Sequence, residues 1–428
     1  MASKRRVAIT GMGLVTPLGL GAEPFWSALT AGRGAVRRVN LMDDGEGKQL
    51  AARVPEFKAR DYVSNRRLLR LMCPTDQFGL VAAQMAISEA GEAELEPARK
   101  GAFIGTSKEM GPIEALFDAM RVSRDETGGM AARLMGLNGF GEIPPLTLVN
   151  GLPNGCLFAA SVMHSIKGPN TNYLGSGEAG LMAIGGAFRA VEEGLADWAL
   201  AGAHDSGVDR WSYANFHRLG MLSKHADDPE RAVRPFDRSR DGFAVSEGAG
   251  MVVLEGLDRA RARGADIYGE ILGFGATCDA AGQVAPRSDG SSLAQAISVA
   301  LNEAELQPGS VGYVNAYASA TPTGDRTELR ALEAVFGGAP HRPLVSGIKG
   351  ALGHMLAASG AVELIATALA IHHHVVPPTT NLKEPDAECQ FDCVQGSARA
   401  ADVTAAMTIS RGIGGQNAVM VLGSPGGQ

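Results

Sequence analysis

Short apolar runs and stretches of helical periodicity alternate along this chain. Residues 6–10 and 198–202 are mostly apolar runs that predict buried strands. Between them, apolar residues recur at spacings of three and four from Leu181 to Leu195, which predicts a helix with one buried face. A glycine-rich turn at residues 175–180 comes directly before that helix. The alternation is typical of an α/β protein.

A second series of strands and helices begins near Asp266. Strands are predicted at residues 268–276, 313–316, 344–346 and 407–410, and helices at about 326–336 and 355–372. The order strand, helix, strand, helix thus occurs once before about residue 255 and once after it. We therefore predict two similar halves, residues 1–255 and 256–428. They are expected to pack as one unit, because no linker rich in proline, serine or charge separates them.

Two segments are expected to lie outside regular structure. Residues 11–19 contain Gly11, Gly13 and Pro17 and are predicted to form a loop after the first strand. They lack the helical glycine and the later acidic residue of a dinucleotide-binding fingerprint, so no nucleotide cofactor is predicted. Residues 107–150 are interrupted by paired glycines and paired prolines and are predicted to form a long excursion from the core.

Composition and charge narrow the class of protein. The 428 residues are 45% apolar and 20% charged, which is enough for a large buried core. The formal net charge of -7 argues against a nucleic-acid partner, because neutralising phosphates requires clustered Lys and Arg. The most apolar predicted helix, about Met355 to Ile371, contains Glu363 and is shorter than the ~20 residues that span a bilayer. We therefore expect a cytoplasmic protein that binds neither nucleic acid nor membrane.

The five cysteines are scattered, and their odd number does not fit a disulfide framework. Cys389 and Cys393 are close in sequence, but no second Cys/His pair lies nearby, so the pattern is weak evidence for zinc. The thiols are interpreted as reduced. No metal and no cofactor is predicted.

Six motifs occur in the order and spacing of one known family. They are Arg234-Pro-Phe-Asp237 with its continuation to Gly250, Lys349-x-x-x-Gly-His354, Gly414-Gly-Gln-Asn-Ala418, and segments at residues 7–19, 185–197 and 313–325. Through them the chain resembles the β-ketoacyl-acyl-carrier-protein synthases, the condensing enzymes of fatty-acid and polyketide assembly, over essentially its whole length. The resemblance implies a thiolase-like α/β fold of five layers, α-β-α-β-α, from two similar halves, and an obligate dimer.

The catalytic nucleophile of that family is missing here. In the family, a Thr-Ala-Cys-x-x-Gly turn precedes the central helix, and its cysteine accepts the acyl chain as a thioester. The matching run is residues 175–180, with Gly177 at the cysteine position. The positive end of a helix dipole would favour a thiolate there, but the position carries no thiol.

Two further family positions also differ. The resemblance implies two histidines that hold the malonyl thioester carbonyl; Tyr317 stands at the first, whereas His354 is retained beside Lys349. Tyr317 can donate a hydrogen bond, but a phenol with a pKa of about 10 transfers protons in a different range from imidazole. His354 and Lys349 either keep a polar pocket or are satisfied core groups. Arg411 replaces the family's gatekeeper phenylalanine.

The losses are too large for a working condensing enzyme. Removing a covalent nucleophile costs on the order of 10⁶ in rate, and losing an acid-base group costs about 10² to 10⁴. The scaffold motifs are nevertheless present.

One subclass of the family matches this combination: the chain-length factors, or β subunits of type II polyketide ketosynthases, which lack the cysteine. They often carry glutamine at its position, where this chain has glycine. We therefore predict a chain-length factor without condensing activity alone. Its predicted partners are a catalytic ketosynthase subunit, in a heterodimer, and an acyl-carrier protein with its acyl chain.

The resemblance also implies that the growing chain lies in a tunnel along the subunit interface. Residues 108–120 cross toward the partner in this family, and as a helix they would present apolar side chains on one stripe. The candidate tunnel residues are Met110, Ile113, Leu116 and Phe117. The alternative is an ordinary buried interface.

The sequence is also compatible with two other functions. One is an active acyl-transfer or ester-forming enzyme that uses Ser176 with His354, although Ser176 is one residue out of phase with the family's nucleophile. The other is a protein that pairs with itself and binds acyl chains.

Overall fold

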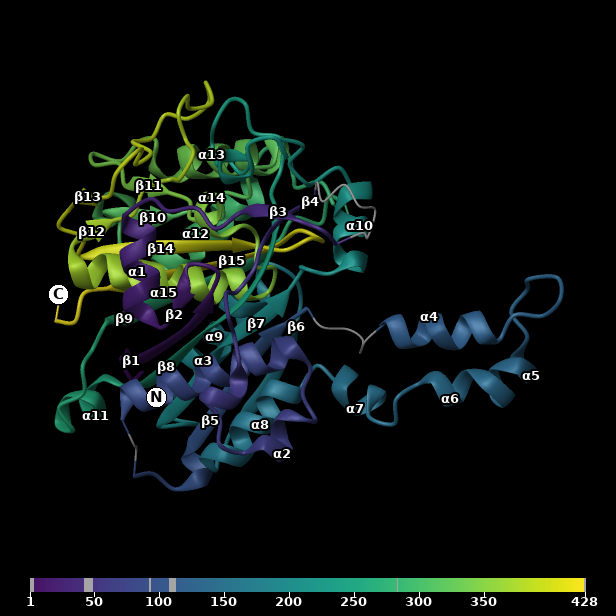
Figure 1. Cartoon of the computed structure of the whole chain (residues 1–428). Helices are drawn as coiled ribbons and strands as arrows, with labels where there is room; N and C mark the ends of the chain where they lie inside the picture. Colours follow the sequence, from purple (N-terminus) through teal and green to yellow (C-terminus); the bar gives the residue numbers. More distant parts are fainter. Residues whose placement is uncertain (1–3, 42–48, 92–93, 108–112, 283, 427–428) are drawn as a thin grey trace.

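A computed structural model of the chain describes residues 4–41, 49–91, 94–107, 113–282 and 284–426 (Figure 1). Within them, most strands belong to one 13-stranded sheet with the main order β11-β10-β14-β15-β9-β1-β8-β7-β5-β6. The strands of this path are β1 (Val7–Thr16), β5 (Lys100–Thr106), β6 (Asn170–Leu174), β7 (Trp198–Ser206), β8 (Val245–Gly256), β9 (Gly269–Cys278), β10 (Tyr313–Asn315), β11 (Leu344–Ser346), β14 (Ala405–Arg411) and β15 (Gln416–Gly423). Three short strands pair with the large sheet beside this path: β2 (Gly19–Leu20), β3 (Arg37–Val39) and β4 (Gln49–Ala52). A separate two-stranded sheet consists of β12 (Val375–Val376) and β13 (Arg399–Ala400).

Helices connect these strands and cover the sheet. The main ones are α1 (Ala22–Thr30), α3 (Pro74–Ala90), α8 (Gly155–His164), α9 (Ala179–Glu192), α10 (Arg210–Arg218), α12 (Ser291–Glu303), α13 (Pro322–Phe336) and α15 (Ala358–His373). Shorter ones are α2 (Arg66–Leu69), α4 (Ile113–Val122), α5 (Ala132–Leu134), α6 (Phe140–Glu142), α7 (Thr147–Gly151), α11 (Leu257–Ala262) and α14 (Lys349–Leu352). Within the described ranges, none of the helices combines the length and the apolar character needed to cross a membrane.

The two halves of the chain repeat one strand topology. The order is β6-β5-β7-β8-β1 in the first half and β11-β10-β14-β15-β9 in the second. In both halves, the first two pairings are parallel and the last two are antiparallel. The halves join where β1 pairs with β9, with Val7 opposite Ile271. The predicted architecture of two similar halves is thus observed, and the division at residue 255 stays a prediction.

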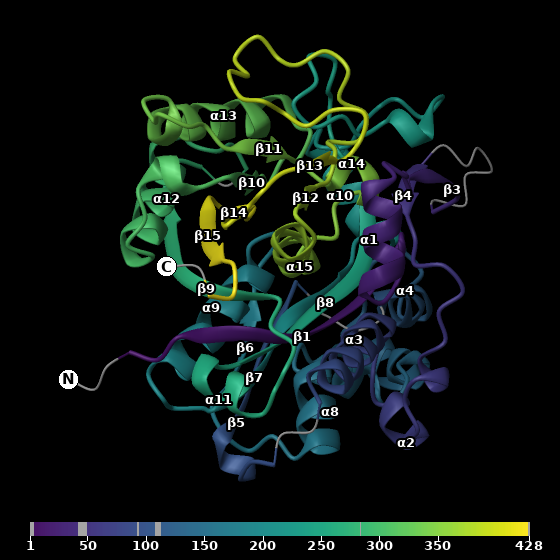
Figure 2. The same cartoon turned by 90° about the vertical axis from the view of Figure 1, so that its left-hand side faces the viewer.

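The central helices α9 and α15 lie between the two halves of the sheet (Figure 2). α9 packs on β5 and β7, and α15 packs on both β8 and β14. The outer faces are covered by α3 and α8 in the first half and by α12 and α13 in the second, so the described chain has the layers α-β-α-β-α. The central helices approach closely at Gly180, where a Cβ would lie 2.7 Å from the Ala357 carbonyl oxygen.

Strand β1 is longer than the sequence predicted. It continues through residues 11–16, which were expected to form a loop because of their glycines. A Cβ on Gly13 would lie 1.8 Å from the Ala82 carbonyl oxygen of α3. These glycines therefore mark the close approach of a helix to a strand and not a turn.

Residues 113–151 form an arm of short helices that projects from the body of the molecule (Figure 1). The arm matches the excursion predicted for residues 107–150. Large apolar side chains are exposed along it, including Phe117, Leu137, Phe140 and Leu148, of which Leu148 is 77% exposed. A monomer rarely exposes so many apolar side chains in one region, so the arm has the character of an interaction surface.

Candidate functional site

The turn before α9 lies against the end of β14 in the centre of the molecule. Gly177 of this turn is buried, and its carbonyl oxygen accepts a hydrogen bond from Ser410 Oγ at 2.6 Å. A Cβ on Gly177 would lie 2.2 Å from the Arg411 carbonyl oxygen and 3.1 Å from Tyr317 Cε2. The position that the resemblance assigns to a cysteine therefore has no room for a side chain unless the β14 backbone moves.

Tyr317 follows β10 in a loop that is held by a buried carboxylate. The backbone N–H of Tyr317 donates to Glu328 Oε1 and that of Ala318 donates to Glu328 Oε2, each at 2.8 Å. Ala318 and Ala320 have φ angles of 44° and 62°, which are left-handed conformations that side chains rarely adopt. Such a backbone persists only where its surroundings enforce it. The loop directs the Tyr317 ring toward His354.

Tyr317 and His354 form a hydrogen-bonded pair with 2.7 Å between the phenol oxygen and Nε2. Nδ1 of His354 accepts from the Leu356 backbone N–H at 3.1 Å. In the neutral imidazole the proton must then lie on Nε2, which donates it to the phenol oxygen. Burial, assisted by Lys349, holds the pKa of His354 well below its ordinary value and so keeps the ring neutral. The O–H of Tyr317 is left to donate to another acceptor.

The phenol is a donor and not a base. Burial, followed by the charge of Glu363, raises the pKa of Tyr317 above its ordinary value. Lys349 lies over the face of the ring, with Nζ 4.1 Å from its centroid, and donates to the Tyr317 carbonyl oxygen at 2.6 Å. Lys349 also forms a buried ion pair with Glu363, whose pKa is raised by burial although Lys349 opposes the shift. Lys349 is therefore committed to partners inside the protein.

Ser176 does not pair with His354. Its Oγ donates to Glu178 Oε2 at 3.1 Å and accepts from the Ile413 N–H at 2.7 Å. Among the described residues, the hydrogen bonds of the His354 ring go to Tyr317 and Leu356. The structure thus does not bring Ser176 and His354 together as a nucleophile and its base.

Arg411 turns its side chain away from Gly177 into a buried polar cluster. The guanidinium donates to Asn417 Oδ1 at 2.9 Å, Thr327 Oγ1 at 3.0 Å and Asp279 Oδ2 at 3.1 Å. Only 6% of Arg411 is exposed. Because three partners hold the side chain, the Arg411 backbone is fixed with its carbonyl oxygen toward Gly177.

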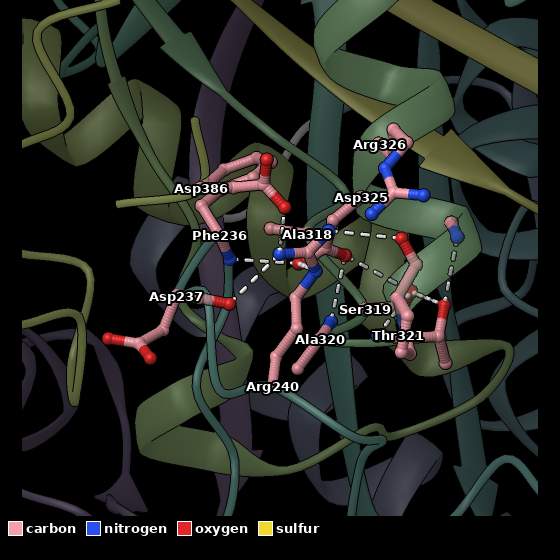
Figure 3. Close-up of polar contacts among 12 residues, drawn as sticks. Phe236, Asp237, Arg240, Ala318, Ser319, Ala320, Thr321, Asp325, Arg326 and Asp386 are labelled. Atoms are coloured by element: carbon pink, nitrogen blue, oxygen red, sulfur yellow. Dashed lines mark hydrogen bonds and ion pairs between the residues drawn. The ribbon is translucent and has the colours of Figure 1, made fainter. Parts of the chain in front are cut away.

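A second buried cluster supports the Tyr317 loop (Figure 3). Arg240 lies 3.5 Å from Asp325 and 2.7 Å from Asp386. Asp325 Oδ1 in turn accepts from the Ala320 N–H at 2.9 Å. Burial raises the pKa of Asp325 to about 7, and the charge of Arg240 opposes this shift. The cluster connects the segment after Arg234-Pro-Phe-Asp237 to the loop that carries Tyr317.

Several residues of these clusters were not predicted. Asp279 and Arg240 bind partners from distant segments, whereas Glu328 binds the backbone only 10 to 11 residues before it. The motif that runs from Arg234 through Asp241 contains Arg240 and could have indicated it.

The structure separates the predicted residues into two groups. One group meets at the Gly177 turn: Gly177, Tyr317, Lys349, His354 and Arg411. Of the predicted tunnel residues, Leu116 and Phe117 lie on α4 in the arm instead, where Leu116 is half-buried and Phe117 is 49% exposed. Met110 and the side chain of Ile113 lie outside the described residues.

The meeting point offers one hydrogen-bond donor, the Tyr317 O–H, and no reactive side chain at the family's nucleophile position. The Tyr317 O–H could hold a carbonyl oxygen, whereas Lys349 and Ser176 are engaged by internal partners. In the described part of the chain, no three His, Cys, Asp or Glu side chains are grouped so as to hold a metal ion.

Comparison with known proteins identifies the family. The beta-ketoacyl synthase N-terminal domain matches residues 4–260, and the C-terminal domain matches residues 268–383. The 3-oxoacyl-[acyl-carrier-protein] synthase 2 of Synechocystis sp. is 35% identical over 426 residues, covering 98% of each chain.

Two solved structures have a fold similar to that of this chain. The ishigamide ketosynthase/chain length factor has a TM-score of 0.87 at 30% identity and covers 99% of this chain and 100% of its own. A type II polyketide synthase acyl-carrier protein in complex with its ketosynthase bound to the hexaketide has a TM-score of 0.84 at 27% identity, with coverage of 99% and 100%. The predicted thiolase-like ketosynthase fold is thereby confirmed, and the chain belongs to the beta-ketoacyl synthase family.

Proposed function

We propose that this chain is a chain-length factor, the non-catalytic subunit that pairs with a catalytic ketosynthase in type II polyketide biosynthesis. The observation that carries the proposal is the closed space at Gly177. The Arg411 carbonyl oxygen lies in the direction in which a nucleophile would point, at 2.2 Å from a Cβ. An enzyme that had merely lost its cysteine would keep that space open, whereas here the surrounding backbone is packed for glycine.

The remaining polar residues support a holding role. Tyr317 uses its oxygen to accept from His354, and one O–H donor remains. That donor can bind a carbonyl but cannot form a covalent bond to it under neutral conditions, because the pKa of the phenol is raised. The proposed contribution of this subunit is therefore shape and contact surface.

The surface supports pairing with another subunit. β6 is the last strand of the main sheet path, and Leu174 at its end is 61% exposed. An exposed edge strand is a template for strand addition. Together with the apolar arm it forms the surface against which we propose that the ketosynthase partner binds.

The same surface would bound the tunnel for the growing chain. We propose that Leu116 and Phe117 on α4, with Met110 and Ile113 nearby in sequence, are covered by the partner and set the end of the tunnel. The acyl chain would be delivered by an acyl-carrier protein, as the complex described above includes one for its own ketosynthase.

Co-expression with a candidate ketosynthase that has the cysteine and both histidines tests the pairing. Native mass spectrometry is expected to give a heterodimer. The substitution Leu174→Arg should abolish it, whereas Leu195→Arg, at a residue 56% exposed outside the arm and β6, should not. A self-paired chain that ignores every such ketosynthase would instead indicate the acyl-binding protein considered above.

A further inference from the structure

Two cysteines lie side by side in the loop between β12 and β13. The Sγ atoms of Cys389 and Cys393 are 3.0 Å apart, about 1 Å more than in a disulfide bond. Both are free thiols; Cys393 is buried and Cys389 is partly exposed. Cys393 is anchored to the sheet, because the next residue, Val394, donates its N–H to the Val345 carbonyl oxygen at 2.9 Å.

The surroundings do not favour a metal site. Structural zinc needs four ligands, and the described residues contain no group of three His, Cys, Asp or Glu side chains that could hold an ion. Apolar neighbours in the same cluster include Phe391 and Leu382. Two thiols this close can join in a disulfide bond once an oxidant removes two electrons.

The two sulfurs are chemically unequal. The hydrogen bond between them lowers the pKa of Cys389 below its ordinary value and raises the pKa of Cys393. Since the thiolate is the nucleophile, the partly exposed Cys389 is suited to attack an oxidant from solvent. The buried Cys393 is already beside the sulfur that it would have to attack in a second step.

We propose that Cys389 and Cys393 form a redox-active dithiol that closes reversibly to an intrachain disulfide, with a low-molecular-weight disulfide such as oxidised glutathione as oxidant. The Cys389 thiolate attacks one glutathione sulfur, forms a mixed disulfide and releases one glutathione thiolate. Cys393 then loses its proton and attacks Cys389 Sγ, which releases the second glutathione thiolate. Two protein thiols are oxidised, one glutathione disulfide is reduced, and the two protons pass to the two glutathione thiolates.

The dithiol is connected by hydrogen bonds to the candidate site. The Cys389 N–H donates to the Asp386 carbonyl oxygen at 2.8 Å, and the Asp386 carboxylate accepts from Arg240 at 2.7 Å (Figure 3). Arg240 contacts Asp325, which holds the backbone of the Tyr317 loop. The oxidised and reduced forms therefore differ at one end of a path that reaches Tyr317.

One peptide reports the reaction in the full-length chain. Trypsin releases residues 384–399 as a single peptide that contains both cysteines and no others. The reduced protein is treated with excess oxidised glutathione, denatured, alkylated with N-ethylmaleimide and digested. The peptide is expected to be unalkylated and lighter by two hydrogen atoms, and dithiothreitol before alkylation should restore two maleimide groups. A doubly alkylated peptide after oxidation overturns the proposal when the exposed Cys278 in the same sample has formed a mixed disulfide.

Single substitutions test the order of the steps. Cys393→Ser is expected to trap glutathione on Cys389, whereas Cys389→Ser should leave Cys393 available to maleimide after denaturation. A wild-type peptide that keeps glutathione on Cys389 without closing the disulfide would also overturn the proposal.

Discussion

His354 donates its Nε2 proton to the phenol oxygen of Tyr317 across 2.7 Å. At the matching positions the family is expected to direct two histidines at the substrate carbonyl. Here the donor of His354 is used inside the protein, on the residue that replaces the other histidine. The pair therefore keeps one donor, the Tyr317 O–H, in place of two imidazoles.

Removing the phenol oxygen should destabilise the fold. Tyr317→Phe leaves the buried His354 Nε2–H without its acceptor, which should lower the free energy of unfolding by about 1–3 kcal/mol. Urea unfolding followed by fluorescence measures the loss. Tyr62→Phe, at a tyrosine that is 43% exposed, is the matched control and should change little. Equal stability of the two variants would contradict the hydrogen-bond assignment.

Because His354 is neutral in the folded chain, the stability of the fold should depend on pH in a particular way. The pKa of His354 is depressed in the folded chain, so below about pH 6.5 the unfolded chain binds a proton that the folded chain does not. The neutral His354 ring therefore supports the folded state above that pH, and this support is lost as the pH falls. Below about pH 6.5, the free energy of unfolding of wild type should fall by up to ~1.4 kcal/mol per pH unit more than that of His354→Gln.

Comparing wild type with His354→Gln isolates the contribution of His354 to the pH dependence of the free energy of unfolding. Carboxylic acids with raised pKa values, such as Asp325, act in the opposite direction but do so in both proteins and cancel in the difference. Parallel stability curves for wild type and His354→Gln would show that the imidazole is protonated in the folded chain.

Restoring the missing thiol should not restore acylation. Gly177→Cys places a side chain against the Arg411 carbonyl oxygen, and overpacking of this kind costs about 1–3 kcal/mol. We expect a lower melting temperature and no acyl adduct by intact mass. Gly256→Cys is the control, because a Cβ there meets nothing within 4 Å. A stable thioester on the thiol introduced at position 177 would show that the site had stayed open.

The buried Arg411 cluster should be costly to break. Arg411→Met leaves Asp279 buried without its cation, which should cost about 3–5 kcal/mol in urea unfolding. The double variant with Asp279→Asn should recover part of that loss. The exposed pair of Arg287 and Asp289 is the control, since Arg287→Met should cost less than about 1 kcal/mol. Similar losses for Arg411→Met and Arg287→Met would argue against the cluster as the anchor of the β14 end.

The tunnel proposal predicts a change of product. Phe117→Ala removes an aromatic ring from α4, so the heterodimer should release products longer by at least one extension unit, as measured by mass spectrometry. Leu195→Ala, outside the arm, should leave product length unchanged. An unaltered product from Phe117→Ala would exclude this side chain as the end of the tunnel.

Part of the site could be predicted from the sequence, because each residue's position within a family motif could be recognised. Gly177, Tyr317 and His354 were located because a motif position can be recognised even when its side chain has changed. The repeated strand order was visible for the same reason, since apolar runs and helical periodicity recur in both halves. The prediction of a loop at Gly13 was wrong, because glycine is favoured both in turns and where a strand packs closely against a helix such as α3.

The closed state of the site could not be predicted. It depends on a backbone carbonyl at Arg411 and on the hydrogen bond from Ser410 to Gly177, residues 233 positions apart in sequence. Neither group is encoded by a residue type at the turn itself. The direction of the Arg411 side chain likewise depends on Asp279 and Asn417, which come together only in the folded sheet.

In the proposed function, this chain assists condensation without carrying the substrate covalently. The most direct test incubates the purified heterodimer with an acyl-acyl-carrier-protein thioester and measures the intact mass of both subunits. We expect the acyl mass on the ketosynthase partner alone. An acyl adduct on this chain, at Ser176 or any other residue, would contradict it.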